Sequence, residues 1–400
     1  MSDAASTPAS LRRRSLDAVL AQAWDAEAFT ASEAMAAVGL TRSTTIDVLD
    51  ELVARGLLAE MPNARAVGEY SKGRPARRFA FRADAGLVVG VDAGRGHVTA
   101  TVADLRGATL ATSRLTVDPE RDSPERRRRA AEKTVEATLT RARRRRDEVV
   151  AICVGVPAPV DRAGRSPAHH DGFWQRMNPD FVDTFAAWAP VVRIENDAAL
   201  AAVAERARGA AVGIDDFIAL LAGERLGAGV WVDGRLLRGA HGGAGETVAF
   251  DRVTGVHNAV GLAPRCVDAA RAAIAAGTLP AGSRLRATDP DTLDAKTILQ
   301  LAAEDDPGAL GVAREVGGAL AVVAAVFGSF FDVRRIVISG AIAAGAAPII
   351  DAARAARVQG NDLPAPEIVA SPLGADIVSV GAVAGAVEAA RSRALDVFPA

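Results

Sequence analysis

The chain has 400 residues, of which half are apolar and 24% are charged, so it is long enough for two or three domains with cores of their own. Its 47 basic and 49 acidic side chains leave a net charge of -2, which excludes a polycation that coats nucleic acid or membrane without selection. Two cysteines, Cys153 and Cys266, are too few for a disulfide scaffold or a cysteine-rich metal cluster, and they fit a reducing cytoplasm.

Residues 1–84 are predicted to form a separate small domain that begins with helices. Apolar residues recur at helical spacing over residues 11–23. Thr30 or Ser32 can cap a short second helix, which Gly39 ends. No apolar segment follows the N-terminal charges, so no signal peptide is predicted.

The rest of this domain completes a pattern that is typical of DNA-binding proteins. Thr41 can cap a third helix that runs to Gly56. Residues 57–61 and 78–82 then have the pattern of two strands on either side of a polar hairpin. Three helices followed by a two-stranded wing predict a winged helix-turn-helix, whose second paired helix enters the major groove of DNA.

Charge in this domain is segregated rather than abundant, since residues 1–84 hold 11 basic and 11 acidic side chains. Basic residues gather in the wing and at the start of the first helix, where they can neutralise phosphates. The alternative is that these arginines form only a solvated surface. The predicted DNA contacts are Thr41, Arg42, Ser43 and Thr44 in the groove, with Arg74 and Arg77 in the wing.

From Leu87 onward, short apolar runs alternate with helical patterns, which is typical of an α/β domain with buried strands. The first two runs are expected to pair antiparallel, because a glycine turn separates them. The predicted strands are 87–94, 97–105, 149–157, 191–197, 216–223, 228–234 and 335–341.

Two longer segments of this part are predicted to be helices. Residues 124–146 place alanine, valine and leucine on one stripe and arginine elsewhere, so the arginines are expected to be solvated. Residues 316–331 form an uncharged apolar segment shorter than the ~20 residues of a membrane-spanning helix. We expect this segment to lie in the core, with a subunit interface as the alternative.

Five segments in order resemble the ROK family of repressors, open reading frames and sugar kinases, in its xylose and N-acetylglucosamine repressor branch. The segments are VGVDAGRGHVTATVADLRG, ICVGVPAPVD, VRIENDAALAAVAE, LAGERLGAGVWVDGRLLRG and GAHGGAGETVAF. The resemblance implies a winged helix-turn-helix followed by a two-lobed actin-like ATPase (ribonuclease H-like) sugar-kinase fold. It implies three domains, 1–84, 85–198 and 199–400, of which the last two are a small and a large α/β lobe.

The resemblance also implies sugar-contact residues. In the family's kinases the aspartate of the END segment is the general base and the neighbouring asparagine binds sugar hydroxyls, and these are Asp197 and Asn196 here. The alternative is that END only caps the following helix. Glu246 is the next candidate, and Asn178 is a further one in a loop that aligns poorly.

Both phosphate loops depart from the kinase pattern. Glu224 and Arg225 replace a Thr-Gly pair in the second loop, and a carboxylate repels a triphosphate. Gly96 replaces the usual Thr or Ser of the first loop. We therefore predict that the protein has no catalytic residue, with Asp197 as a vestigial base, and no ATP or other cofactor.

The family's zinc site is also incomplete. Ala249 stands where the family has a histidine, and Cys266 is the one cysteine near the usual cluster. Since Zn²⁺ takes four ligands and His257 with Cys266 offers two, no metal is predicted, and packing must hold the loop 250–266. His169, His170 and His241 show no metal-ligand spacing and are expected to be surface or packed residues.

The sequence thus predicts a cytoplasmic carbohydrate-sensing transcriptional regulator, expected to be a repressor. Its expected partners are a double-stranded DNA operator and a sugar or sugar-phosphate effector, and a homodimer or homotetramer would match paired half-sites. One alternative is an active ATP-dependent sugar kinase with an appended DNA-binding domain. Another is a regulator that has lost its ligand and responds only to a protein partner.

Overall fold

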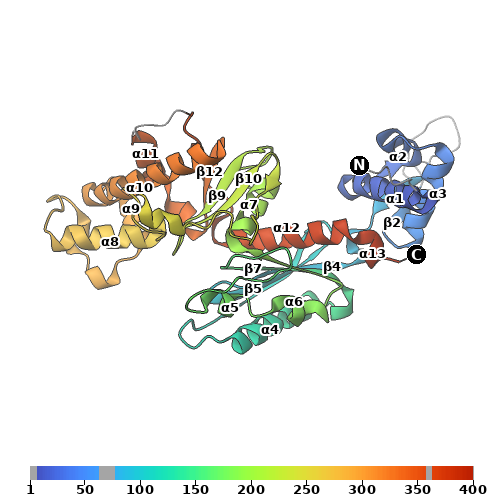
Figure 1. Ribbon diagram of the computed structural model, residues 1–400, viewed down its shortest axis with the longest axis horizontal. Coiled ribbons are helices and arrows are strands. Elements are labelled where there is room, and N and C mark those ends of the chain that lie inside the picture. The colour runs from blue at the N-terminus through green and yellow to red at the C-terminus, as the bar shows by residue number, and fades with distance from the viewer. Residues whose placement is uncertain (1–6, 63–76, 357–362, 400) are drawn as a thin grey trace.

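Three parts follow one another along the chain, namely a helical head, a small lobe and a large lobe (Figure 1). The computed structural model describes residues 7–62, 77–356 and 363–399. The first helix, α1 (Pro8–Asp25), and the last, α13 (Ala394–Val397), meet at the head, where Arg13 forms an ion pair with Asp396 at 2.8 Å. The chain therefore passes through both lobes and returns to its beginning.

The head is the predicted winged helix-turn-helix. Its other helices are α2 (Ala31–Val38) and α3 (Arg42–Ala54), and its strands β1 (Phe29–Thr30), β2 (Leu58–Met61) and β3 (Arg78–Phe81) form an antiparallel sheet in the order β1-β3-β2. The apolar stripe of α1 is buried as its spacing predicts. Strand β1 was not predicted, because two residues are too few to show a period.

Local capping fixes the two helices of the pair. Thr30 and Glu33 form a capping box, in which the Thr30 N–H donates to Glu33 Oε2 at 2.7 Å and the Glu33 N–H donates to Thr30 Oγ1 at 3.2 Å. Gly39 then ends α2 in the left-handed region, and Thr41 caps α3 by accepting from the Thr44 N–H at 3.3 Å. The predicted boundaries of both helices are confirmed.

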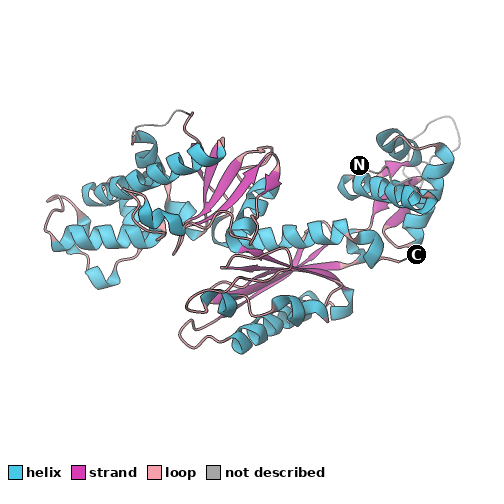
Figure 2. Ribbon diagram, viewed as in Figure 1, coloured by secondary structure: helices cyan, strands magenta, loops and turns pink. Residues whose placement is uncertain are grey.

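The small lobe is built on a five-stranded sheet in the order β6-β5-β4-β7-β8. Neighbours among the first three strands pair antiparallel, and β4, β7 and β8 run parallel. Helix α4 (Pro124–Ala142) contacts β5 and β6, while α12 (Ile377–Ser392) contacts β4 and β7, and these two helices lie on opposite faces of the sheet (Figure 2). The remaining elements are β4 (Leu87–Asp92), β5 (His97–Asp104), β6 (Thr109–Thr116), β7 (Val149–Val156), β8 (Val191–Asn196), α5 (Phe173–Met177) and α6 (Phe181–Ala186).

The large lobe has a second five-stranded sheet, in the order β11-β10-β9-β12-β13. Its strands are β9 (Phe217–Leu221), β10 (Gly227–Val232), β11 (Arg235–Leu236), β12 (Arg335–Ser339) and β13 (Glu367–Ala370). Helix α7 (Asp197–Arg208) contacts β9 and β10. Ile218 and Leu220 of β9 belong to the core that contains α8 (Leu262–Ala275), α9 (Ala295–Ala303), α10 (Pro307–Phe331) and α11 (Ala347–Ala355). Because strand side chains alternate, Phe217 and Ala219 join the core on the α7 side.

The two lobes repeat one topology, because each sheet places its third, second, first, fourth and fifth strands in that spatial order. This duplication is the two-lobed fold that the resemblance implied. All seven strands predicted from Leu87 onward are present. Strands β6, β11 and β13 were not predicted, because β6 is polar and largely exposed and the other two have two and four residues.

Helix α12 departs from the predicted division, which assigned residues 199–400 to the large lobe. The helix follows β13 of the large lobe but lies across the small-lobe sheet, in contact with β4 and β7 (Figure 1). Small residues permit this, since a Cβ added at Gly90 of β4 would lie 2.5 Å from the backbone nitrogen of Val383 in α12. The chain thus crosses from the large lobe back to the small lobe after residue 376.

Helix α10 contains the apolar segment 316–331, and its inward side is buried against α8, α9 and α11, as expected of a core helix. Among the described residues it is the one helix whose length and composition would allow it to cross a membrane. Half of its apolar window is buried inside the protein, which makes this weak evidence for a span.

Helix α4 differs from its prediction at one arginine. It ends at Ala142 rather than residue 146, because Arg143 adopts a left-handed conformation with φ 55°. Arg127, expected on the surface, is fully buried and pairs with Asp122, whose side chain is 3% exposed. Its guanidinium also donates to the carbonyl oxygens of Ala93 (3.1 Å) and Gly94 (2.9 Å), in the turn between β4 and β5.

Replacement of Arg127 by methionine should lower the free energy of unfolding by about 3–5 kcal/mol, because the Asp122 carboxylate would remain buried without its partner. Arg129→Met is the matched control on the same helix, where the side chain is exposed, and should change stability by less than about 0.5 kcal/mol. Chemical unfolding followed by circular dichroism measures both. Equal stability of the two variants would contradict a structural role for Arg127.

Candidate functional site

The predicted sugar-contact residues Asn196 and Asp197 lie where β8 ends and α7 begins. Asn196 Oδ1 accepts hydrogen bonds from the N–H groups of Ala198 (2.9 Å) and Ala199 (3.1 Å), and its Nδ2 donates to the carbonyl of Ala158 at 3.1 Å. The capping interpretation is therefore confirmed for Asn196. Because an amide has two N–H groups, Asn196 keeps one donor for a further acceptor.

Asp197 lies close enough to Asp92 and Glu246 for both carboxylates to raise its pKa. Although solvent still reaches the side chain, burial is the largest cause and raises the pKa of Asp197 to about 7, while a hydrogen bond from the Ala198 N–H at 2.7 Å opposes the shift. Asp197 is therefore divided between its acid and carboxylate forms at neutral pH, so it can both donate to and accept from a hydroxyl group.

Glu246 reaches the same place from the large lobe, on a glycine-rich segment that touches the small lobe. A Cβ added at Gly242 would lie 2.0 Å from the carbonyl oxygen of Val160, and the φ of Gly242 is +73°, so glycine is needed there. Burial raises the pKa of Glu246, while the charges of Arg225 and His169 oppose the shift. The structure thus brings Asp197 and Glu246 together at the junction of the lobes, and their predicted contact with sugar stays a prediction.

A network of ion pairs around the buried Glu195 supports this junction, and no sequence motif indicated it. Glu195, one residue before the cap, accepts from Arg193 (3.0 Å) and from Arg238 of the large lobe (2.9 Å). Arg193 also donates to Glu388 of α12 at 2.8 Å. Burial alone would lower the pKa of its guanidinium, but the surrounding negative groups, Glu195 and Glu388 among them, together raise that pKa above its usual value. The chain of charges therefore links the large lobe, β8 and α12. Alternation along β8 was the available signal, because it places Arg193 and Glu195 on one face of the strand.

Asn178 is used within its own loop. Its Nδ2 donates to the carbonyl of Gly164 at 3.0 Å and to Ser166 Oγ at 3.1 Å, and the residue is 7% exposed. Its Oδ1 is buried without a hydrogen-bond partner among the described residues. The observed role of Asn178 is to hold the loop between β7 and α5, and its predicted sugar contact has no support in these bonds.

The first phosphate loop, between β4 and β5, is closed on itself. His97 Nε2 lies 3.0 Å from Asp92 Oδ2, so the aspartate at the start of this loop already has a hydrogen-bond partner. The Arg127 guanidinium donates hydrogen bonds to three carbonyl oxygens of the same turn, those of residues 93–95. No motif indicated either contact, because both depend on side chains that meet only in the folded turn.

The second phosphate loop is joined by backbone hydrogen bonds to the segment before α8. The Gly261 N–H donates to the Glu224 carbonyl (2.9 Å), and the Leu226 N–H donates to the carbonyl of Ala259 (2.9 Å). Thr247 Oγ1 adds a bond to the Leu226 carbonyl at 2.6 Å. The exposed Glu224 and Arg225 side chains thus stand on a loop with a fixed backbone.

Arg265 organises the loop that carries the family's zinc site. Its guanidinium donates to the carbonyls of Val260 (3.0 Å), Val256 (2.9 Å) and Asn258 (2.9 Å). Burial lowers the pKa of Arg265, and none of the carboxylates among the described residues forms an ion pair with it. Cys266 points into the large-lobe core, where burial raises the pKa of its thiol to about 12. Hydrogen bonds from Arg265, and not packing alone as expected, therefore hold this loop.

The predicted groove contacts lie at the exposed start of α3. Thr41, Arg42 and Ser43 are exposed, and Thr44 is half-buried. Thr41 Oγ1 lies 2.9 Å from Thr44 Oγ1 and 3.2 Å from Ser43 Oγ, so the hydroxyl groups form one cluster at the helix N-terminus. Such a cluster can donate to phosphate or to base edges.

The two predicted wing contacts have different outcomes. Arg77 forms ion pairs with Asp50 of α3 (2.9 Å) and Glu60 of β2 (2.8 Å), and its guanidinium lies 5.0 Å from the ring centroid of Phe79. Its charge is therefore largely neutralised within the head, which weakens the case for a phosphate contact. Arg74 lies outside the described residues.

The sequence profile described as the ROK family matches residues 88–386. A xylose repressor of Caldicellulosiruptor bescii is 26% identical over 210 residues, which are 52% of this chain and 51% of that protein. A xylose repressor of Bacillus spizizenii is 25% identical over 208 residues, 52% of each chain. The matched region thus spans about half the length of these curated relatives.

Two solved structures extend the comparison of the fold. A ROK family transcriptional regulator, described as a homolog of the E. coli MLC protein, covers 95% of this chain and 97% of its own, with a TM-score of 0.74 and 20% identity. A ROK family glucokinase from Streptomyces griseus, in complex with glucose and AMPPNP, covers 76% of this chain and 100% of its own, with a TM-score of 0.56 and 25% identity. The likeness to the regulator includes the head, and it is a likeness of fold.

The raised pKa of Asp197 gives a pH-dependent stability with a defined sign. The native state holds a proton on Asp197 up to about pH 7 that the unfolded chain releases near pH 4, so the contribution of Asp197 to stability is fully present below about pH 4 and is lost as the pH rises through 7. Asp197→Asn removes this charge and should be more stable than the parent by roughly 1–3 kcal/mol at pH 8, with little difference at pH 4.5. Chemical unfolding at the two pH values measures the change.

Proposed function

The chain belongs to the ROK family, and from that premise we propose that it is a DNA-binding transcriptional regulator whose operator affinity is set by a carbohydrate bound between its lobes. The head would bind DNA through the start of α3, and Asn196, Asp197 and Glu246 would bind hydroxyl groups of the carbohydrate. The named relatives make xylose and related pentoses the first effectors to test, and repression the first direction of control.

The observation that carries this proposal is the path of α12 from the lobe junction to the head. One end of α12 touches α7, which begins at Asp197. Its other end reaches α1, where Arg391 donates to Asp25 at 2.8 Å and to the Ala21 carbonyl at 2.9 Å. A sugar that favours one arrangement of the lobes would therefore shift the support on which the head rests.

Further contacts bind the head to the segment after α12 and to the small lobe. Arg55, the residue after α3, donates to the carbonyls of Leu395 (3.1 Å) and Phe398 (2.8 Å), beyond the end of α12. Arg106, at the turn between β5 and β6, donates to the Trp24 carbonyl at 3.0 Å. Apolar side chains of the head and of α12 also belong to one continuous buried cluster. The head is thus held by several directed bonds, and it can respond to a small movement of α12.

Sugar kinase activity is the second candidate, and the environment of Asp197 favours it. A general base works best when its pKa is near the working pH. The pKa of Asp197, about 7, meets this condition at neutral pH. Against it, Asp92 is already paired with His97, and Glu224 places a carboxylate on the second phosphate loop. We therefore expect no ATP turnover with any sugar of a broad panel. Turnover that Asp197→Asn abolishes would support the kinase instead.

DNA binding is tested by fluorescence polarisation with DNA from the protein's own promoter region, between about 50 and 200 mM salt. Binding should be tighter than to unrelated DNA and should weaken steeply with salt, because phosphate contacts release counterions. Arg42→Ala should cost about 1–3 kcal/mol of operator affinity. The control is Arg121→Ala, whose side chain on the small lobe is 81% exposed. Equal, weak binding to both DNAs would contradict the regulator.

Coupling is tested with Arg391→Met, which removes the bonds to Asp25 and Ala21 while leaving the lobe junction intact. A sugar that binds the parent should shift operator affinity by about 5- to 150-fold, and the variant should bind the same sugar equally but lose most of that shift. Arg314→Met, at an exposed position of α10, is the control and should keep the shift.

Calorimetry with the sugar panel tests the remaining alternative, which is a regulator that has lost its sugar ligand. Sugar binding that Glu246→Ala abolishes would support the effector site. No binding of any sugar would favour a regulator that answers only to a protein partner.

A further inference from the structure

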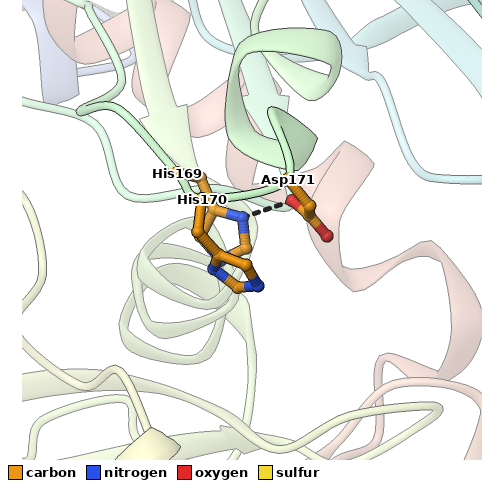
Figure 3. Close-up of side chains that lie close together, drawn as sticks. All are labelled: His169, His170 and Asp171. Carbon is orange, nitrogen blue, oxygen red and sulfur yellow. Dashed lines mark hydrogen bonds and ion pairs between the residues drawn. The ribbon is translucent and has the colours of Figure 1, made fainter.

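Two histidines and an aspartate stand together on the loop between β7 and α5. His169, His170 and Asp171 each offer one ligand atom, and these atoms lie within 4.8 Å of one another (Figure 3). The His169 Nδ1 is hydrogen-bonded to Asp171 Oδ1. Neighbours in sequence rarely converge in an extended chain, so the local turn must bring them together.

Hydrogen bonds fix that turn without help from a ligand. The Gly172 N–H donates to the His169 carbonyl at 3.0 Å, and the Phe173 N–H donates to Asp171 Oδ1 at 2.8 Å. The loop on either side is tied down as well, because Gln175 Nε2 donates to the Pro167 carbonyl at 2.7 Å. The backbone beneath the three side chains is therefore preformed, which reduces the entropy that a ligand would have to remove.

Aromatic contacts fix the His169 ring. Its centroid lies 4.4 Å from that of Trp174 and 4.2 Å from that of His170, and the His169 side chain is 21% exposed. Asp171 is exposed but held, because its Oδ1 accepts from the Phe173 N–H and is bonded to His169 Nδ1. His170 is exposed, so its ring is the ligand that can adjust to an ion.

We propose that His169, His170 and Asp171 form a binding site for a divalent transition metal of the zinc, cobalt or nickel type. Imidazole nitrogens with one carboxylate oxygen are ligands that these ions prefer, whereas Mg²⁺ and Ca²⁺ prefer oxygen ligands alone. A tetrahedral ion with bonds of about 2.1 Å holds its ligand atoms about 3.4 Å apart. Rotation of the exposed His170 side chain would close the remaining gap.

The position of this site gives it a consequence for the lobe junction. His169 is close enough to Glu246 to lower the pKa of that carboxyl group, although the two belong to different lobes. A bound divalent ion would add positive charge facing Glu246, and three protein ligands leave a coordination position open for water or a hydroxyl group. Metal binding itself does not depend on the proposed function, because it can be measured without DNA or sugar.

The test is a titration of tag-free, metal-stripped full-length protein with Co²⁺, followed by its visible ligand-field absorption. One equivalent per chain should bind, and Zn²⁺ should displace it. His170→Ala changes one exposed side chain and should weaken Co²⁺ binding at least about 10-fold. His241→Ala, another exposed histidine, is the matched control and should bind as the parent does.

Two results would overturn the proposal. The first is a spectrum no different from that of free Co²⁺ at the same concentration. The second is equal binding by the parent and by both His170→Ala and His169→Ala, since the ion would then lie elsewhere. Either result would leave the operator titration unaffected, so failure of the metal site is distinguishable from failure of the proposed function.

Discussion

The close packing of α7 against α12 is the constraint on which the rest of the structure depends. Backbone meets backbone where Gly381 faces the Leu200 carbonyl, and a single methyl group would not fit between them. Since α7 contacts the large-lobe sheet and α12 contacts the small-lobe sheet, the two lobes cannot rotate without moving this contact. Helix α7 begins at Asp197, and α12 ends beside the head. The candidate sugar site and the head are therefore both in contact with this pair of packed helices.

Charge reinforces this packing near the C-terminal end of α12 (Ile377–Ser392). Glu195 accepts from Arg238 of the large lobe and from Arg193 of β8, and Arg193 also donates to Glu388 of α12. At the head, Arg391 and Arg55 bond to carbonyl and carboxylate groups that are fixed by helices. Arginine suits these positions, because its planar donors can serve two partners at once. Arg193, Arg238, Arg391 and Arg55 thus act as internal connectors between parts of the fold.

The sequence predicted the architecture well because that architecture rests on local signals. Capping residues such as Thr30 and Thr41 mark helix starts, and buried strands show as apolar runs. The path of α12 could not be predicted in this way, because its contacts join residues nearly 300 positions apart, such as Gly90 and Val383. The same reason explains why the structural contacts of Arg127, His97 and Arg265 were not predicted. The sequence does not distinguish an arginine or histidine that is solvated from one that stabilises a turn by hydrogen bonds. The END segment was identified by its resemblance to the ROK family. Its capping role was predicted from the preference of asparagine and aspartate for the N-cap position.

The central claim is that occupancy of the lobe junction and operator binding are linked through α12, and thermodynamic reciprocity tests it most directly. The measurement is the affinity of an effector sugar for the full-length protein, by calorimetry, with and without saturating operator DNA. The account predicts that operator DNA changes the sugar affinity at least about 5-fold, by the same factor that the sugar changes the DNA affinity. Equal sugar affinity with and without DNA would contradict it.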